Sequence, residues 1–118
     1  MDITLKRAYD PPAKSDGRRV LVDRIWPRGV ARDDLRIEAW LKELAPSPGL
    51  RKWFGHDPDK WEEFKGRYAR ELDERPEALA QLAEMAKAGR LTLVFGARDT
   101  EHNNAVALRE YLERRPTR

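Results

Sequence analysis

The sequence lacks several residue types and motifs on which common enzyme chemistries depend. It contains no cysteine, which excludes disulfides, thiolate metal sites and a cysteine nucleophile. Serine occurs only at Ser15 and Ser47, and neither position has the strand–turn–helix context of a nucleophile elbow. No glycine-rich phosphate loop or dinucleotide fingerprint occurs. The two histidines, His56 and His102, are far apart in the sequence, so their spacing predicts no metal site, and the cofactor stays open.

Long apolar runs are also absent. No run approaches the roughly 18 residues of a membrane span, and the acidic, strand-like start is unlike a signal peptide. We therefore expect a cytoplasmic protein that makes no contact with membranes. Charged residues make up 38% of the chain, against about 25% in a typical globular protein, yet the net charge is only +3. This balance is too even to indicate nucleic-acid binding by itself.

The apolar residues predict one small domain of mixed helices and strands. The length of 118 residues, with four tryptophans, three tyrosines and three phenylalanines, fits a single core. Residues 3–7 alternate apolar and polar side chains, as a partly exposed strand does. Residues 20–22 and 91–95 are continuous apolar runs, typical of adjacent parallel strands buried on both faces. The predicted class is α/β, a single small domain with a short, mostly parallel sheet flanked by helices; the orientation of the first strand stays open.

Proline and glycine mark the ends of the predicted helices. The helical segments are residues 40–44, residues 48–54 after a Ser47 cap, a segment behind Asp57-Pro58, a segment from Pro76 to about Gly89, and a last helix that starts near Thr100. The third of these carries an apolar stripe at spacings of three and four, which predicts a buried face: Trp61, Phe64, Tyr68 and Leu72. The tail from Arg114 to Arg118 is expected to fray.

The loop after residues 20–22 is rich in side chains that bind anions. In open α/β sheets, a loop that leaves the carboxyl end of a strand lies where ligands bind. This loop, residues 23–29 (DRIWPRG), carries two guanidinium groups suited to phosphate or carboxylate, Arg24 and Arg28. Trp26 offers a flat face for stacking. The structural alternative is an ion pair between Asp23 and Arg24, with Trp26 as a core plug.

A second polar loop, residues 96–104 (GARDTEHNN), joins the last strand to the final helix. The free N–H groups at the start of that helix favour an anion. An Asp or Thr of the loop can cap the helix, but capping does not explain why four further polar residues arrive together: Arg98, His102, Asn103 and Asn104. His102 beside Asp99 is placed to give or take a proton, as a catalytic pair would. The alternative is that His102 packs or caps locally.

Four sequence blocks resemble those of a known family. They are residues 20–29 (VLVDRIWPRG), 40–47 (WLKELAPS), 53–58 (WFGHDP) and 101–105 (EHNNA). In this order they cover nearly the whole chain and are similar to the YeaO-like family, small bacterial proteins classed as a domain of unknown function. The resemblance implies a cytosolic α/β domain over residues 1–118, with no established activity, cofactor or substrate. A related, longer branch carries cysteines near the last loop, and its thiol chemistry does not transfer to this chain.

The two polar loops favour a small-molecule site over other functions. We expect a crevice in which Arg24, Arg28 and Arg98 hold a phosphate- or carboxylate-bearing ligand. The other expected participants are Trp26 for stacking, His102 with Asp99 for a proton, and Asp23, Asn103, Asn104 and His56 as further ligand contacts. The alternatives are a nucleic-acid-binding module, which stays open but less favoured, and a protein-interaction module without catalysis. The ligand, the reaction and the oligomeric state are left open.

Overall fold

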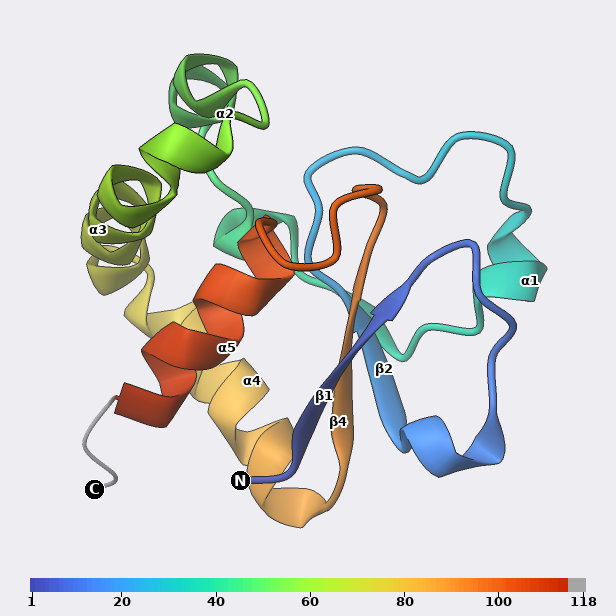
Figure 1. The fold of residues 1–118 in the computed structure, drawn as a ribbon. Coiled ribbons are helices and arrows are strands. Elements are labelled where there is room, and N and C mark those ends of the chain that lie inside the picture. The colour runs from blue at the N-terminus through green and yellow to red at the C-terminus, as the bar shows by residue number, and fades with distance from the viewer. Residues whose placement is uncertain (115–118) are drawn as a thin grey trace.

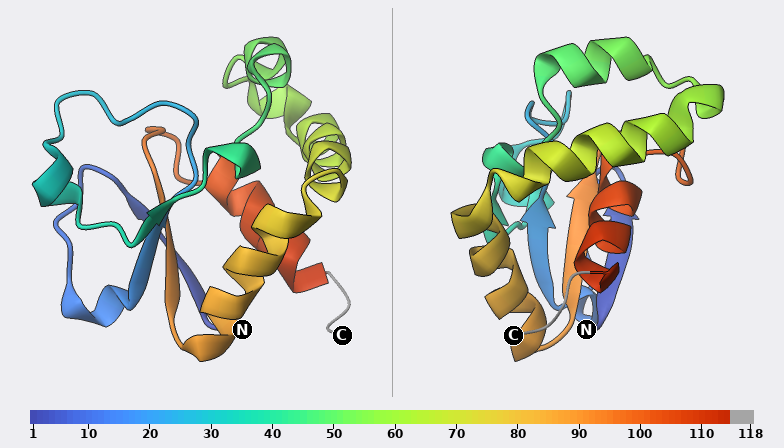
Figure 2. Two further views of the ribbon diagram at one scale, coloured as in Figure 1. Left: turned by 180° about the vertical axis from the view of Figure 1, so that it is seen from behind. Right: turned by 90° about the vertical axis from the view of Figure 1, so that its left-hand side faces the viewer.

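A four-stranded sheet forms the centre of the protein. A computed structural model describes residues 1–114, with strands β1 (Ile3–Arg7), β2 (Arg18–Leu21), β3 (Ala39–Trp40) and β4 (Leu91–Phe95). The strands lie side by side in the order β1-β4-β2-β3 (Figure 1). All neighbouring pairs are parallel, so the strand arrowheads lie toward one edge of the sheet (Figure 2). The predicted α/β class is confirmed.

Helices cover the sheet on one side, and a helical turn and long loops lie on the other. The helices are α1 (Arg32–Leu35), α2 (Pro48–Phe54), α3 (Trp61–Asp73), α4 (Pro76–Ala88) and α5 (Asn104–Arg114), with short 3-10 turns η1 (Lys14–Asp16), η2 (Lys42–Leu44) and η3 (Pro58–Lys60). Helices α2 to α5 share one side and α1 lies on the other (Figure 1). The frayed tail expected over residues 114–118 lies outside the described residues, apart from the end of α5. Within residues 1–114, no helix is long and apolar enough to cross a membrane.

Strands β2 and β4 are buried on both faces, as their continuous apolar runs predict. Val20 and Leu93 pack into the larger core cluster together with residues of α3, α4 and α5. Leu21 and Val94 point to the opposite face, where they pack with Leu35 of α1 in a smaller cluster. Two cores therefore hold the central strands, one on each side.

The structure shows the orientation of β1, and it places the start of β2 earlier than the sequence predicts. Strand β1 is parallel to β4, with Ile3 opposite Leu91. Strand β2 begins at Arg18, two residues before the predicted start, and includes the buried Arg19. The Arg19 guanidinium donates hydrogen bonds to the Asp16 carboxylate at 2.7 Å and to the Leu35 carbonyl at 2.8 and 3.1 Å. A buried charge of this kind is tolerated because it is paired with Asp16 and each of its three nitrogens donates a hydrogen bond.

The apolar stripe of α3 confirms the predicted helix face. Phe64, Tyr68 and Leu72 are almost completely buried, whereas Trp61 is only partly buried. The Phe64 ring stacks on Phe54 at a centroid distance of 4.4 Å, which joins α3 to α2. The Tyr68 hydroxyl donates a hydrogen bond to the Leu44 carbonyl, and burial raises the pKa of this phenol. The aromatic stripe is therefore a core element rather than a cofactor box.

The predicted helix over residues 40–44 is wrong in its first part. Trp40 belongs to the edge strand β3, opposite Leu21, and its indole N–H donates to the Asp23 carbonyl at 2.7 Å. Only Lys42–Leu44 forms a helical turn, η2. Strand β3 and helix α1 are missing from the predicted elements because each is too short to show a periodic pattern of apolar residues. Contacts with the rest of the fold hold them in place.

The last helix begins at Asn104, four residues after the predicted start near Thr100. The delay has a local cause, because the Asp99 carboxylate accepts hydrogen bonds from the backbone N–H groups of Glu101 and His102 and holds a turn there. Asn103 then caps the helix, with its side-chain oxygen accepting from the Val106 N–H at 2.9 Å.

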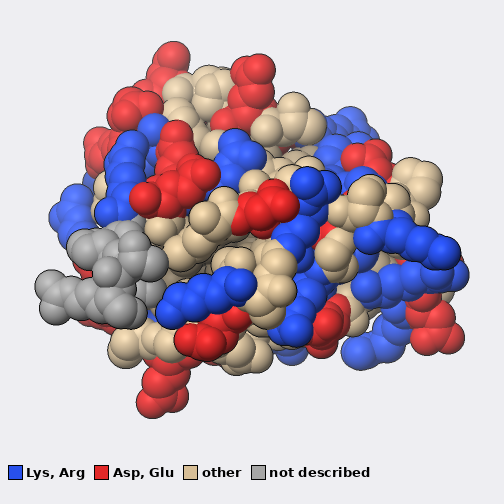
Figure 3. Space-filling view, turned by 90° about the horizontal axis from the view of Figure 1, so that it is seen from below, with Lys and Arg blue, Asp and Glu red and all other residues tan. Residues whose placement is uncertain are grey.

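One end of the molecule displays many of the charged side chains. Figure 3 views the molecule from the end opposite the strand arrowheads, and lysine and arginine side chains there alternate with aspartate and glutamate. The face is therefore a mixture of both signs, with basic groups denser on its right-hand side. Such a mixture suits solubility better than it suits a continuous phosphate-binding surface.

Candidate functional site

The two polar loops meet at the strand carboxyl ends and border a cleft of about 660 Å³. Figure 1 shows both loops leaving the same edge of the sheet, to the right of α2. All ten residues expected at the site line this cleft: Asp23, Arg24, Trp26, Arg28, His56, Arg98, Asp99, His102, Asn103 and Asn104. Sequence reasoning missed a fourth arginine, Arg51, and an apolar wall that includes Ile25, Phe54 and Phe64.

The Asp23 carboxylate ties the two loops together beneath the cleft. It accepts hydrogen bonds from the Gly96 N–H at 2.8 Å and from the Asn104 side-chain amide at 3.0 Å. The same amide also donates to the Val22 carbonyl at 3.0 Å, so Asn104 joins α5 to the end of β2. Burial raises the pKa of Asp23, although both hydrogen bonds and the charge of Arg51 act in the opposite direction. Asp23 and Asn104 thus fix the spacing of the loops.

Asp99 orients His102. The Asp99 carboxylate lies 3.0 Å from the His102 Nδ1 atom. It also accepts hydrogen bonds from the backbone N–H groups of Glu101 and His102. The hydrogen bond from the Glu101 N–H is the main cause of a lowered Asp99 pKa, and the contacts with His102 add to it. The His102 and Trp61 rings also form a T-shaped pair, at a centroid distance of 5.3 Å. Within residues 1–114, the Nε2 atom has no hydrogen-bond partner, which leaves it able to donate to a ligand when the ring is protonated or to accept from one when it is neutral.

Four arginines border the cleft, and among residues 1–114 no ion pair joins any of them to an acidic side chain. Arg24, Arg28, Arg51 and Arg98 are all exposed, and none forms an ion pair within 4.0 Å in the part of the chain that the structure describes. Within the described residues, the hydrogen bond that a guanidinium group of these four arginines makes is a long one, from an Arg24 nitrogen to the Pro46 carbonyl at 3.5 Å. Because only Asp23 and Asp99 bring negative charge to the lining, the cleft carries an excess of positive charge.

Trp26 packs as the core-plug alternative describes. Its indole N–H donates to the Val30 carbonyl at 2.7 Å, and its ring meets Trp40 edge-on at a centroid distance of 5.4 Å. The ion pair between Asp23 and Arg24 that accompanied this alternative is not formed within the described residues. Trp26 still borders the cleft, so stacking of a ligand on its ring stays a prediction.

Asn103 and His56 border the cleft in different ways. Asn103 is 3% exposed and uses both amide atoms locally, donating to the Asp99 carbonyl at 2.9 Å and capping α5. It therefore holds the loop on the helix. His56 is exposed and follows Gly55, and both residues adopt left-handed backbone angles, with φ of 57° and 54°. Histidine adopts this region less easily than glycine, so the turn that presents His56 is held by its surroundings.

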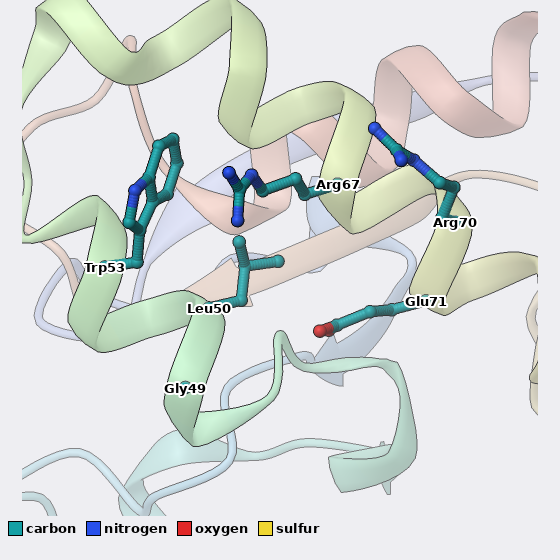
Figure 4. Close-up of a pocket in the computed structure, with 6 residues that line it drawn as sticks. All are labelled: Gly49, Leu50, Trp53, Arg67, Arg70 and Glu71. Carbon is teal, nitrogen blue, oxygen red and sulfur yellow. The ribbon is translucent and has the colours of Figure 1, made fainter.

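A smaller hollow of about 260 Å³ lies between α2 and α3 (Figure 4). Two of its charged side chains, Arg67 and Glu71, already have partners. The Arg67 guanidinium points at the Trp53 ring, with its carbon 4.3 Å from the ring centroid, and also pairs with Glu63. Glu71 accepts hydrogen bonds from the backbone N–H and the hydroxyl of Ser47, at 2.8 and 2.6 Å. The hollow therefore joins two helices and offers little to a ligand.

The described residues contain no group of three or more histidine, cysteine, aspartate or glutamate side chains that could hold a metal ion.

Known proteins are similar to this chain over nearly its whole length. Residues 2–118 match a family model described as the inactive DUF488-N3 subclade. The chain is 42% identical over 112 residues to the uncharacterized protein YeaO of Escherichia coli K12, which covers 95% of this chain and 97% of that protein. It is 39% identical over 113 residues to the uncharacterized protein Rv3073c of Mycobacterium tuberculosis H37Rv, covering 96% of this chain and 95% of that protein. No solved structure matches the chain.

Proposed function

The chain belongs to the YeaO-like family, matched here by the inactive DUF488-N3 model, and we propose that it binds a small phosphate- or carboxylate-bearing ligand in the cleft at the strand carboxyl ends. The observation that carries this proposal is a set of four exposed arginines that form no ion pair within residues 1–114: Arg24, Arg28, Arg51 and Arg98. Guanidinium groups gathered around one concave site repel one another until an anion neutralises them. Their forked donors match the oxygen atoms of phosphate and carboxylate.

His102 adds a directed hydrogen bond to this charge. Asp99 holds the ring through Nδ1, so Nε2 is the atom that meets the ligand in the proposed complex. In the protonated ring the Nε2–H group donates to an anionic ligand oxygen, whereas in the neutral ring with Nδ1–H on Asp99 the Nε2 atom accepts. The same arrangement serves general acid–base catalysis when the bound ligand has a reactive bond. The word inactive in the description of the matched family favours binding without turnover. We therefore assign His102 and Asp99 to ligand recognition first, and to proton transfer as the second possibility.

Calorimetric titration with a panel of phosphate- and carboxylate-bearing compounds tests the proposal. Each lost charge-assisted hydrogen bond contributes about 1.5–3 kcal/mol, so Arg28→Ala and His102→Ala are each expected to weaken binding by about tenfold or more. Arg114→Ala, an exposed arginine at the far end of α5, is the matched control and should bind as the parent does. Circular dichroism shows whether each variant is folded.

Two results contradict the proposal. If no anion binds, or if Arg28→Ala and His102→Ala both bind as the parent does, the cleft residues form only a solvated cluster. The alternative of nucleic-acid binding has its own signature, because the affinity for an oligonucleotide then falls steeply with salt in proportion to the phosphates contacted. A salt series with a short duplex and with a small anion therefore separates the two functions.

A further inference from the structure

The size of the cleft bears on what kind of anion it accepts. Its volume of about 660 Å³ lies within the range of roughly 300–1,000 Å³ typical of pockets for small organic molecules. A single phosphate or carboxylate group fills only a small part of this space. The charged groups alone therefore do not account for the dimensions of the site.

The remaining lining is apolar. It includes side chains from both loops, from the segment before α2, and from α2 and α3: Ile25, Pro27, Pro46, Phe54, Phe64 and Ala97. Ile25 is unusual in this lining because it is a large apolar residue that is 60% exposed. Only Met1 and Tyr9 are comparable exposed large apolar residues among residues 1–114, and neither lines the cleft. Ile25 also belongs to neither core cluster, so burial within the fold does not explain it.

We infer that the ligand is an organic anion with an apolar body, whose phosphate or carboxylate group meets the arginines while its carbon skeleton covers Ile25 and the neighbouring apolar wall. This inference rests on the proposed anion site and adds the chemical class of the rest of the molecule. Contact with the ligand removes the exposed Ile25 side chain from water, which contributes to affinity in proportion to the apolar area covered. The arginines supply orientation and charge, and the apolar wall supplies selectivity among anions.

Calorimetric titrations with phenyl phosphate, glycerol 3-phosphate, inorganic phosphate and phenol, at one pH and ionic strength, test the inference. Phenyl phosphate is expected to bind at least tenfold more tightly than glycerol 3-phosphate, which has a polar body of similar size. Tenfold corresponds to about 1.4 kcal/mol, or roughly 55 Å² of apolar surface removed from water, which is less than a phenyl ring offers. Phenol, without the anionic group, should not bind measurably.

The outcomes separate this inference from the proposed function. Equal affinity for the three phosphates overturns the apolar body and leaves the anion site intact. Absence of binding by all three overturns the anion site and the inference with it. Phenol binding as tightly as phenyl phosphate also overturns the inference, because the anion then contributes nothing.

Two variants of the exposed Ile25 test whether this residue of the apolar wall causes the preference for phenyl phosphate. Ile25→Ser is expected to reduce the preference for phenyl phosphate over glycerol 3-phosphate by about threefold or more, whereas Ile25→Leu, which keeps an apolar side chain, should retain it. Because Ile25 lies outside both core clusters, both variants should fold as the parent does. An unchanged preference in Ile25→Ser overturns the role given to this residue.

Discussion

Asp23 and Asp99 are the two carboxylates of the cleft, and their surroundings give them opposite properties. Burial beneath the loops raises the pKa of Asp23. Asp99 lies nearer to solvent, and hydrogen bonds from the Glu101 N–H and from His102 lower its pKa. The first residue therefore works as a structural tie between the loops, whereas the second stays ionised and holds His102 in place. Two residues of one type thus have separate tasks in one site.

The lowered pKa of Asp99 has a consequence for stability in acid. A carboxyl group whose folded pKa lies below its unfolded value contributes stability above the unfolded value, and that contribution disappears as the pH falls through the folded pKa. Asp99→Asn keeps an oxygen that can accept the backbone N–H bonds but has no charge to lose. Its free energy of unfolding should therefore fall less than that of the parent between about pH 5 and pH 3.

Urea denaturation at a series of pH values measures this difference. Asp10→Asn is the control, because Asp10 is exposed and its side chain accepts no hydrogen bond within the described residues. The control should follow the parent. Parallel pH profiles for Asp99→Asn and the parent show that the Asp99 contacts do not stabilise the folded state.

At the scale of elements, one glycine fixes how β2 starts beside β4. Gly17 has φ of 65° and ψ of −133°, a backbone conformation that side chains rarely adopt. A Cβ atom at this position would lie 2.3 Å from the Arg90 carbonyl oxygen. That carbonyl accepts a hydrogen bond from the Arg18 N–H at 3.0 Å. Arg90 directly precedes β4, so this bond begins the pairing of β2 with β4. The close approach of the two backbones thus requires glycine.

Gly17→Ala should lower the free energy of unfolding by about 3 kcal/mol, from backbone strain and from displacement of the Arg90 carbonyl. Gly66→Ala is the matched comparison in the exposed middle of α3, where an added Cβ meets nothing within 4 Å. There the same substitution should stabilise the protein by about 0.5–1 kcal/mol, because alanine favours the helix. Urea titrations that show equal effects at the two positions contradict the importance of the close approach.

Helix α3 is held mainly by its aromatic stripe. Phe64 is 2% exposed and stacks between Phe54 and Tyr68, so Phe64→Ala should cost about 3–5 kcal/mol. Trp61 is only partly buried, which places Trp61→Ala toward the lower end of the same range. Denaturant titrations give both values. A shift equivalent to less than about 1 kcal/mol for Phe64→Ala shows that the stripe is not part of the core.

The elements differ in how far the sequence predicts them. Strands β2 and β4 and helices α2 to α5 follow from apolar runs, periodic stripes and proline or glycine boundaries. Arg19 could not be predicted as a buried strand residue, because a charged side chain normally indicates exposure. It is buried here because it pairs with Asp16 and the Leu35 carbonyl. The edge strand at Trp40 likewise depends on its indole reaching the Asp23 carbonyl. Contacts between distant segments decide such cases, and no local pattern records them.

At the scale of the whole molecule, the parallel sheet explains why the sequence could predict which polar residues line one cleft. Because parallel strands deliver their following loops to one edge, the polar residues after β2 and β4 line one cleft. Arg51 was not predicted, since nothing in the sequence of α2 indicates how that helix sits over the sheet. The apolar wall was missed for the same reason, because Phe54 and Phe64 have the spacing of ordinary core residues. Tertiary packing adds a fourth positive charge and a second kind of lining to the site.

The charge gathered in the cleft predicts how the stability of the whole protein responds to an anion. Four arginines and two carboxylates line the cleft, so the arginines repel one another when no anion is bound. The double variant Arg28→Ala/Arg98→Ala should therefore unfold in chloride at a temperature no lower than the parent. Phosphate that binds only the folded state stabilises it by about 1.4 kcal/mol at ten times its dissociation constant, which corresponds to a rise of roughly 4–6 °C.

Thermal unfolding in phosphate and in chloride, at equal ionic strength, measures this response. Phosphate also stabilises proteins in general by exclusion from their surfaces, and the double variant Arg70→Ala/Arg114→Ala, which removes the same charge outside the cleft, accounts for that part. The parent and this control should show the full rise, whereas Arg28→Ala/Arg98→Ala should keep only the general increment. Equal rises in all three proteins mean that phosphate acts on the solvent and not in the cleft.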